Sequence, residues 1–282
     1  MAVTAMRLVN GSSTLELTRE TGYRVQKLDI GFPTVRPVSQ GRTDRDGEDD
    51  TTELHGASAV SMDIKLFPTT TLTLTEILDS LRAFCHPKIR PYLVVERDGV
   101  ERRIMLRADQ QSAPITNPFV TEVQVAWRAP DGVEEAVTEE VGLANAVASA
   151  AAGRSYPRTY PLTYPASSAV GSVTVTNSGT VPVLPVLRLY GPCTNPRVEN
   201  QTTGEQMVFS GLTIAAGDYL EIDSKNATIR LNGLSNQSRY NLLSFAVSTF
   251  PHLEPGLNTV RYYPVSFSTG ARLEVRYRSA WI

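Results

Sequence analysis

Short apolar runs separated by turn residues fill the stretch from Val170 to Gly233. Gly, Pro, Asn and Asp favour turns because they adopt or fix backbone angles that other residues avoid. Strands that follow one another at turn spacings of about 8–12 residues are typical of an antiparallel β-sandwich. The stretch therefore predicts a β-sandwich and offers almost no chemistry. The turns are, in order, Asn177–Gly179, Gly191–Pro192, Asn195–Pro196, Thr203–Gly204, Ala216–Asp218, Asp223–Asn226 and Leu231–Gly233.

Three further strands are expected after these turns, at Leu242–Ser248, Thr259–Tyr263 and Arg272–Tyr277. The same half of the chain carries several aromatic side chains that could stack on sugar rings. Most of them occur in strand-like segments, so we expect them mainly in the core. They are Tyr219, Tyr240, Phe245, Phe250, Tyr262 and Tyr263.

The N-terminal half mixes strands with one helix. Apolar residues alternate through Ala59–Phe67 and again through Pro118–Arg128, which predicts two half-buried strands. Thr73–Glu76 forms the pattern of a helix capping box, apolar residues follow at helical spacing, and Pro87 ends the element. The turn at Asp98–Gly99 lies between two strand-like runs and predicts a hairpin.

The domain boundary is expected around a segment rich in alanine, tyrosine and proline. Val137–Gly153 is interpreted as a weak helix, and the three Tyr-Pro pairs between Tyr156 and Pro165 as a stiff extended strap. The predicted organisation is a first domain at 1–136, a linker at 137–165 and a sandwich at 166–282. Whether the last strand returns to the first domain stays open.

Composition excludes several classes of protein. Of 282 residues, 41% are hydrophobic and 20% charged, enough for a sizeable core. The net charge of −2 argues against a general binder of nucleic acid or anionic membranes. Met1–Asn10 lacks the apolar segment of a leader and no apolar run reaches the ~20 residues of a membrane helix, so we expect synthesis in a cytoplasm without membrane insertion. The two cysteines, Cys85 and Cys193, are expected as buried thiols.

Catalytic motifs are nearly absent. The chain has no nucleophile elbow, phosphate-binding loop, dinucleotide fingerprint or zinc-protease helix motif, and its three histidines, His55, His86 and His252, are scattered. The acidic run Asp44–Asp50 does not fit a calcium loop and is interpreted as a solvated turn. We therefore expect no catalytic residue, metal site or cofactor. A carbohydrate-binding module is the alternative function, and a glycosidase that uses two carboxylates is the least favoured.

The order of these turns resembles that of the siphophage distal tail proteins, the Dit family. The likeness continues into the N-terminal half, where an Ile30–Arg36 loop precedes an acidic loop around Asp46–Gly47. In the C-terminal half the matching segments are Asn177–Thr180 with Pro182 and Pro185, Leu189–Pro196, Asn200, Thr203–Gly204, Gly217–Asp223, Leu231–Gly233 and Pro255–Asn258 before Val260–Tyr262.

The resemblance implies a mainly β fold: an N-terminal β-sandwich-like, ring-forming domain with one α-helix and a long hairpin, and a C-terminal galectin-like β-sandwich. It implies a non-enzymatic structural protein of the virion tail tip that forms a homo-hexameric ring. Its partners would be the tail tube protein above and a tail-tip hub or fibre protein below, and DNA would pass through the channel without sequence-specific binding.

Ring subunits contact their neighbours through two different surfaces, which exposed loops can supply. The proline-braced loop Ile30–Pro37 and the polar run Gln40–Thr52, a loop or the tip of a long hairpin, suit this role. A nearly neutral chain also suits a channel that DNA must not stick to. The candidate subunit-interface residues are Gly31, Phe32, Pro33, Arg36, Arg42, Arg45, Asp46 and Asp49.

Overall fold

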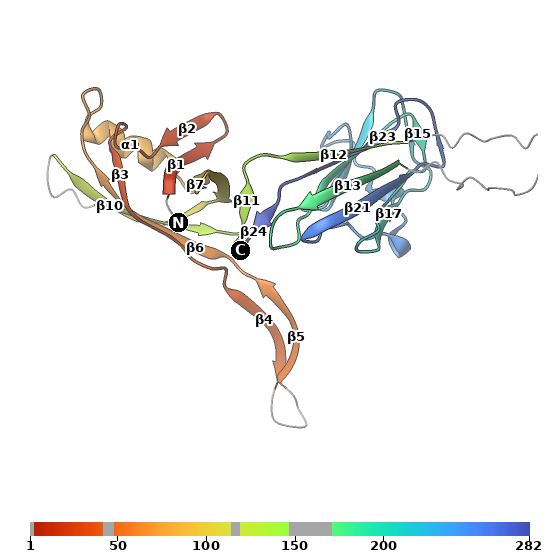
Figure 1. The fold of residues 1–282 in the computed structure, drawn as a ribbon, viewed down its shortest axis with the longest axis horizontal. Helices are drawn as coiled ribbons and strands as arrows, with labels where there is room; N and C mark the ends of the chain where they lie inside the picture. The colour runs from red at the N-terminus through yellow and green to blue at the C-terminus, as the bar shows by residue number, and fades with distance from the viewer. Residues whose placement is uncertain (1–2, 42–47, 114–118, 147–170) are drawn as a thin grey trace, which may run out of the picture. The chain divides into compact units, whose positions relative to one another are not determined.

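The computed structural model of the chain describes residues 3–41, 48–113, 119–146 and 171–282 (Figure 1). They form two compact units, Met1–Val137 with Trp281–Ile282, and Thr138–Ala280. The expected mainly β class is confirmed, because antiparallel sheets make up both units and α1 is the one α-helix among the described residues.

A six-stranded sheet of the first unit gathers both ends of the chain. Its strand order is β2-β1-β7-β8-β11-β24. Asp98 and Gly99, with φ of 52° and 80°, make the tight turn between β7 and β8 that the sequence predicts. The bounds are β1 (Val3–Asn10), β2 (Ser13–Glu16), β7 (Tyr92–Arg97), β8 (Val100–Met105), β11 (Glu134–Ala136) and β24 (Ala280–Trp281).

The second sheet of this unit has the order β3-β6-β10-β9. The two alternating strands expected from the sequence are confirmed as β6 and β10, which pair along their whole length. Every second residue of each strand is buried, including Met62 and Ile64 of β6 and Val125 and Trp127 of β10. The bounds are β3 (Tyr23–Ile30), β6 (Ser58–Leu66), β9 (Arg107–Ser112) and β10 (Thr121–Ala129).

Helix α1 (Leu74–Phe84) begins at the expected capping box. The Glu76 amide donates to the Thr73 hydroxyl at 3.4 Å, and the Thr73 amide donates to the Glu76 carboxylate at 2.8 Å. Ile77, Leu78 and Leu81 bury the apolar face of the helix in the core of the first unit. The helix prediction is therefore confirmed, with its end at Phe84, just before the predicted stop.

Strands β4 (Val35–Gly41) and β5 (Glu48–His55) pair only with each other and form a long hairpin. In Figure 1 this hairpin extends away from the sheets of the first unit. The predicted hairpin is therefore present. Its tip, residues 42–47, lies outside the described residues.

The second unit is a sandwich of two main antiparallel sheets and one small one. One main sheet has the order β12-β23-β14-β19-β20 and the other β13-β21-β16-β17; β18-β15-β22 is the small sheet. The bounds are β12 (Glu140–Asn145), β13 (Gly171–Asn177), β14 (Val186–Tyr190), β15 (Cys193–Thr194), β16 (Arg197–Asn200), β17 (Glu205–Val208), β18 (Thr213–Ile214), β19 (Tyr219–Asp223), β20 (Thr228–Leu231), β21 (Gly256–Tyr263), β22 (Ser266–Phe267) and β23 (Arg272–Tyr277).

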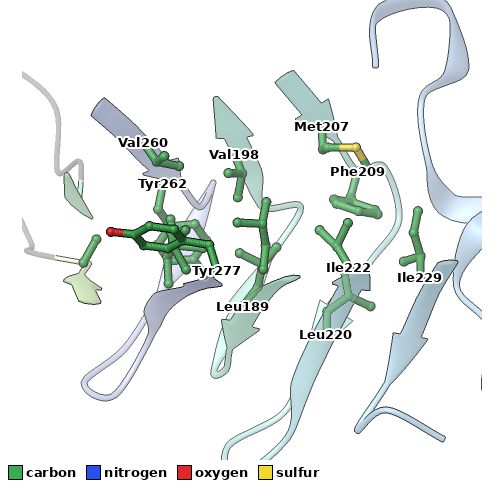
Figure 2. Close-up of a cluster of buried hydrophobic side chains, with 14 of the residues drawn as sticks. Leu189, Val198, Met207, Phe209, Leu220, Ile222, Ile229, Val260, Tyr262 and Tyr277 are labelled. Atoms are coloured by element: carbon green, nitrogen blue, oxygen red, sulfur yellow. The ribbon is translucent and has the colours of Figure 1, made fainter. Parts of the chain in front are cut away.

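The core of the second unit lies between its two main sheets (Figure 2). Leu189 and Ile222 point into it from one sheet, and Val198 and Tyr262 from the other; all four are fully buried. Cys193 is buried in the same cluster. The turn-separated strands of the sequence thus build a sandwich, as predicted.

Two local predictions are wrong. The described start of the expected Val137–Gly153 helix forms strand β12, because pairing with β23 and burial of Ala144 outweigh the helix preference of alanine. Residues 147–153 and the Tyr-Pro strap lie outside the described residues. The expected strand Leu242–Ser248 is replaced by two 3₁₀ turns, η1 (Tyr240–Leu242) and η2 (Phe245–Val247).

Candidate functional site

The loop after β3 presents an aromatic side chain to solvent on a fixed backbone. The Gly31 amide donates to the Ala59 carbonyl at 2.8 Å, and the Gly56 amide donates to the Thr34 carbonyl at 2.6 Å. These bonds tie the loop to the start of β6, while the Phe32 side chain remains 85% exposed. Phe32 is therefore a large apolar side chain presented on a braced loop, and it is a candidate contact for a neighbouring subunit.

Some of the candidate interface residues lie in the braced loop, some lie in the hairpin, and some lie outside the described residues. Gly31, Phe32 and Pro33 lie in the braced loop, and Arg36 is exposed at the start of β4. Asp49 lies in β5, opposite Gln40 in the hairpin register. Arg42, Arg45 and Asp46 lie outside the described residues. The loop leads directly into the hairpin, and we call the two segments together the candidate assembly surface.

Paired charges cover part of the six-stranded sheet and were not predicted. Glu134 of β11 accepts from Arg97 of β7 at 2.8 Å and from Arg102 of β8 at 3.4 Å. The Arg102 guanidinium also lies 4.2 Å from the ring centroid of Trp281, the residue that brings the C-terminus to this sheet. These partly buried pairs join strands that are far apart in sequence, and their role is to fix the sheet.

A similar network of charged and aromatic side chains covers the outer face of the five-stranded sheet. Arg188 bonds Glu221 at 2.9 Å, and the guanidinium of Arg272 lies 3.9 Å from the ring centroid of Tyr190. The ring of Tyr219 lies 5.4 Å from that of Tyr190, with Arg188 beside it. Each of these rings therefore has an arginine against it.

His252 lies between two carboxylates in the second unit. Its Nδ1 lies 2.8 Å from the carboxylate of Glu205 and its Nε2 2.9 Å from that of Glu254. Partial burial acts to lower the pKa of His252, but hydrogen bonds and charge from Glu254 and Glu205 outweigh it and raise the pKa. Sequence reasoning missed this cluster because Glu205 is 47 residues from His252 along the chain.

The cysteines are buried and free, as predicted. Burial raises the pKa of Cys85 to about 12 and also raises that of Cys193, so both stay protonated thiols. Within the described residues, no group of three or more His, Cys, Asp or Glu side chains is placed to hold a metal ion. In the same part of the chain, no helix is long and apolar enough to cross a membrane.

The C-terminal part of the chain matches a known protein family. Residues 178–281 match the family model described as "Siphovirus-type tail component, C-terminal domain". No curated protein sequence is similar enough to match the chain.

Solved structures match the chain over nearly its whole length. The structure of Dit (gp 19.1) from phage SPP1 is 13% identical, with a TM-score of 0.66 over 99% of this chain and 100% of that one. A chain from the phage P2 baseplate, solved with Ca in its activated conformation, is 10% identical, with a TM-score of 0.53 over 99% and 98% of the two chains. A chain from the p2 baseplate in its activated conformation with Sr is 10% identical, with a TM-score of 0.52 over 97% of both chains.

Residues 178–281 are thus similar to the C-terminal domain of siphovirus-type tail components. The resemblance to siphophage distal tail proteins, predicted from the order of the turns, is confirmed. The family match supports a structural role in a phage tail.

Proposed function

We propose that this chain forms a homo-hexameric ring at the distal end of a siphophage tail. The ring joins the tail tube protein on one side to a tail-tip hub or fibre protein on the other, and DNA passes through its channel. Residues 1–136 close the ring, and residues 166–282 project outward as a galectin-like sandwich.

The observation that carries this proposal is the likeness to phage SPP1 Dit, which spans both units of the chain. That protein is described as a paradigm of the hub adsorption apparatus of phages that infect Gram-positive bacteria. The other two similar chains come from baseplates, which are assemblies of several proteins. The likeness therefore supports a place in such an assembly.

The candidate assembly surface supports a ring for physical reasons. A closed ring needs two different complementary patches on each subunit. The hairpin β4–β5 extends from the sheets of the first unit, and the braced loop that precedes it exposes Phe32, so both can contact a neighbour. The net charge of −2 lets DNA pass without the counterion release that drives non-specific binding.

Native mass spectrometry and electron microscopy of the purified chain test the proposal. We expect a particle of six chains with a central hole, and labelling of the same protein at the tail tip of the virion. A chain that stays monomeric at high concentration and is absent from virions would overturn the hub function. A ring of another subunit number would overturn the hexamer alone.

A further inference from the structure

The connection between β20 and β21 displays three aromatic rings on the surface of the second unit. The ring centroids of Tyr240 and Phe245 lie 5.3 Å apart, and those of Tyr240 and Phe250 lie 6.3 Å apart at 23° between the ring planes. Tyr240 is 38% exposed and Phe245 60% exposed, and Phe250 is half-buried. We call Tyr240, Phe245 and Phe250 the aromatic patch.

The backbone that carries the patch is held firmly to strand β17 and its continuation. The Ser244 amide donates to the Val208 carbonyl at 2.9 Å, and the Thr249 amide donates to the Gln206 carbonyl at 2.8 Å. Leu243, between the two 3₁₀ turns, is buried in the sandwich core. The rings are therefore presented in a preset arrangement, which lowers the entropy cost of binding a ligand.

The segment that carries the patch is almost uncharged, and it combines polar residues with exposed apolar ones such as Leu234 and Val247. Residues 232–250 include one charged side chain, Arg239, whose guanidinium donates to the Ser238 carbonyl at 3.1 Å. Asn236, Asn241 and Thr249 are exposed in the same segment. Their amides and hydroxyl both donate and accept hydrogen bonds. A neutral ligand rich in hydroxyl groups matches this surface, whereas a phosphate or carboxylate ligand calls for several cations.

The size of the patch favours a small ligand over a protein. Because an aromatic side chain has roughly 150–250 Å² of surface, the exposed fractions leave on the order of 200–300 Å² of ring surface. A stable protein interface needs about 800 Å² on each partner. The flat C–H face of a pyranose fits one or two exposed rings, and hydroxyls at its edge reach the surrounding amides.

The remaining aromatic side chains of the sandwich are less suitable. Tyr262 is fully buried. Arginines lie against the rings of Tyr190, Tyr219 and Tyr263. Of the aromatic residues for which the sequence raised sugar stacking, the structure leaves the aromatic patch as the place where rings meet solvent together.

We propose that the aromatic patch is a binding site for a neutral oligosaccharide, with Phe245 and Tyr240 stacking on the sugar and amide groups of the same segment bonding its hydroxyls. This site belongs to the sandwich alone and does not depend on ring formation.

Saturation-transfer NMR with the full chain tests the site. The probes are neutral oligosaccharides of glucose, galactose, rhamnose and N-acetylglucosamine, and polyglycerol phosphate as the anionic comparison. We expect saturation of the C–H protons of at least one neutral probe. Phe245→Ala and Tyr240→Ala should each weaken its binding about tenfold, the effect of losing one ring contact.

Tyr240→Phe keeps the ring and should retain binding. Leu257→Ala, at a position 66% exposed in the same unit, serves as the matched control and should bind as the parent does. The proposal is overturned if no neutral probe binds, if the Phe245→Ala/Tyr240→Ala double variant binds as the parent does, or if only polyglycerol phosphate binds. Loss of a tail protein from pull-downs with the double variant, without any sugar binding, would assign the patch to a protein partner instead. None of these outcomes depends on whether the chain forms a ring or is present in virions. Those two measurements test the hub function separately.

Discussion

At the scale of single residues, His252 gives the second unit a dependence on pH. Both ring nitrogens lie within 3 Å of a carboxylate oxygen, and only the imidazolium can donate from both. A histidine whose pKa is raised in the folded state adds stability that is fully present below its unfolded pKa of about 6.5. That stability is lost as the pH rises through the folded pKa.

We expect NMR titration to give His252 a pKa above that of an ordinary histidine, and Glu254→Gln to lower it. The melting temperature of the second unit should fall in the parent as the pH rises above about 6.5 and through the raised pKa of His252. In His252→Gln this fall should be smaller. His86→Gln, at an exposed position, is the control and should follow the parent. Identical pH profiles for His252→Gln and the parent would contradict the assignment.

Gly179 is a residue where the absence of a side chain decides packing. A Cβ built there would overlap the Ala280 carbonyl, which accepts from the amides of Thr180 at 2.9 Å and Val181 at 3.3 Å. Gly179→Ala should therefore lower the free energy of unfolding of the second unit by about 1–3 kcal/mol, as overpacking does. Urea unfolding measures this change. Ser178→Ala, at the exposed neighbouring position, should be nearly neutral, and equal effects of the two would refute the explanation.

At the scale of elements, the capping box sets where α1 begins. Thr73→Ala removes the oxygen that accepts from the Glu76 amide and should destabilise the first unit by about 1 kcal/mol. Thr75→Ala changes an exposed position inside the helix and should have little effect or a slightly favourable one. Denaturant unfolding followed by circular dichroism compares the two. A Thr73→Ala variant as stable as the parent would show that packing of Ile77 and Leu81 alone fixes the helix.

Elements with a complete local signal were predictable from sequence. The alternation in β6 and β10, the capping box of α1 and the Asp98–Gly99 turn each specify a conformation within a few residues. Strand β12 was not predictable, because the alanine-rich segment Val137–Gly153 that contains it favours a helix and its pairing partner β23 lies far along the chain. The 3₁₀ turns around Leu243 were missed because an apolar run does not itself distinguish a strand from irregular structure.

The candidate site likewise has one part with a local sequence signal and other parts without one. The prolines around Phe32 predict an exposed loop, and the structure places that ring in water. The cluster of His252 with Glu205 and the pair of Arg102 with Trp281 carry no sequence signal, since only the fold brings these residues together. The aromatic residues of the second half were expected mainly in the core, and Phe245 was assigned to the expected strand Leu242–Ser248. The exposure of Phe245 follows from the 3₁₀ turn that replaces this part of the strand.

At the scale of the whole molecule, the two proposals place different tasks on the two units. The first unit carries the candidate assembly surface, and the second unit carries the aromatic patch. Phe32 is 85% exposed and Phe245 is 60% exposed, so neither side chain is needed for its own unit to fold. Replacing either with alanine should change the free energy of unfolding by less than about 0.5 kcal/mol.

Phe32→Ala should weaken the ring because an exposed aromatic that becomes buried between subunits is a typical hot spot. A loss of about 1.4 kcal/mol at each interface raises the dissociation constant about tenfold, and this loss recurs at every contact around the ring. Sedimentation velocity over a dilution series should therefore show Phe32→Ala falling apart at concentrations where the parent ring is intact. Phe245→Ala is the matched control. It should leave the hexameric ring intact and weaken sugar binding, whereas Phe32→Ala should weaken the hexameric ring and leave sugar binding unchanged. If Phe32→Ala rings persist to the same dilution as the parent, the contact between subunits lies elsewhere on the first unit and the hairpin β4–β5 becomes the surface to change next.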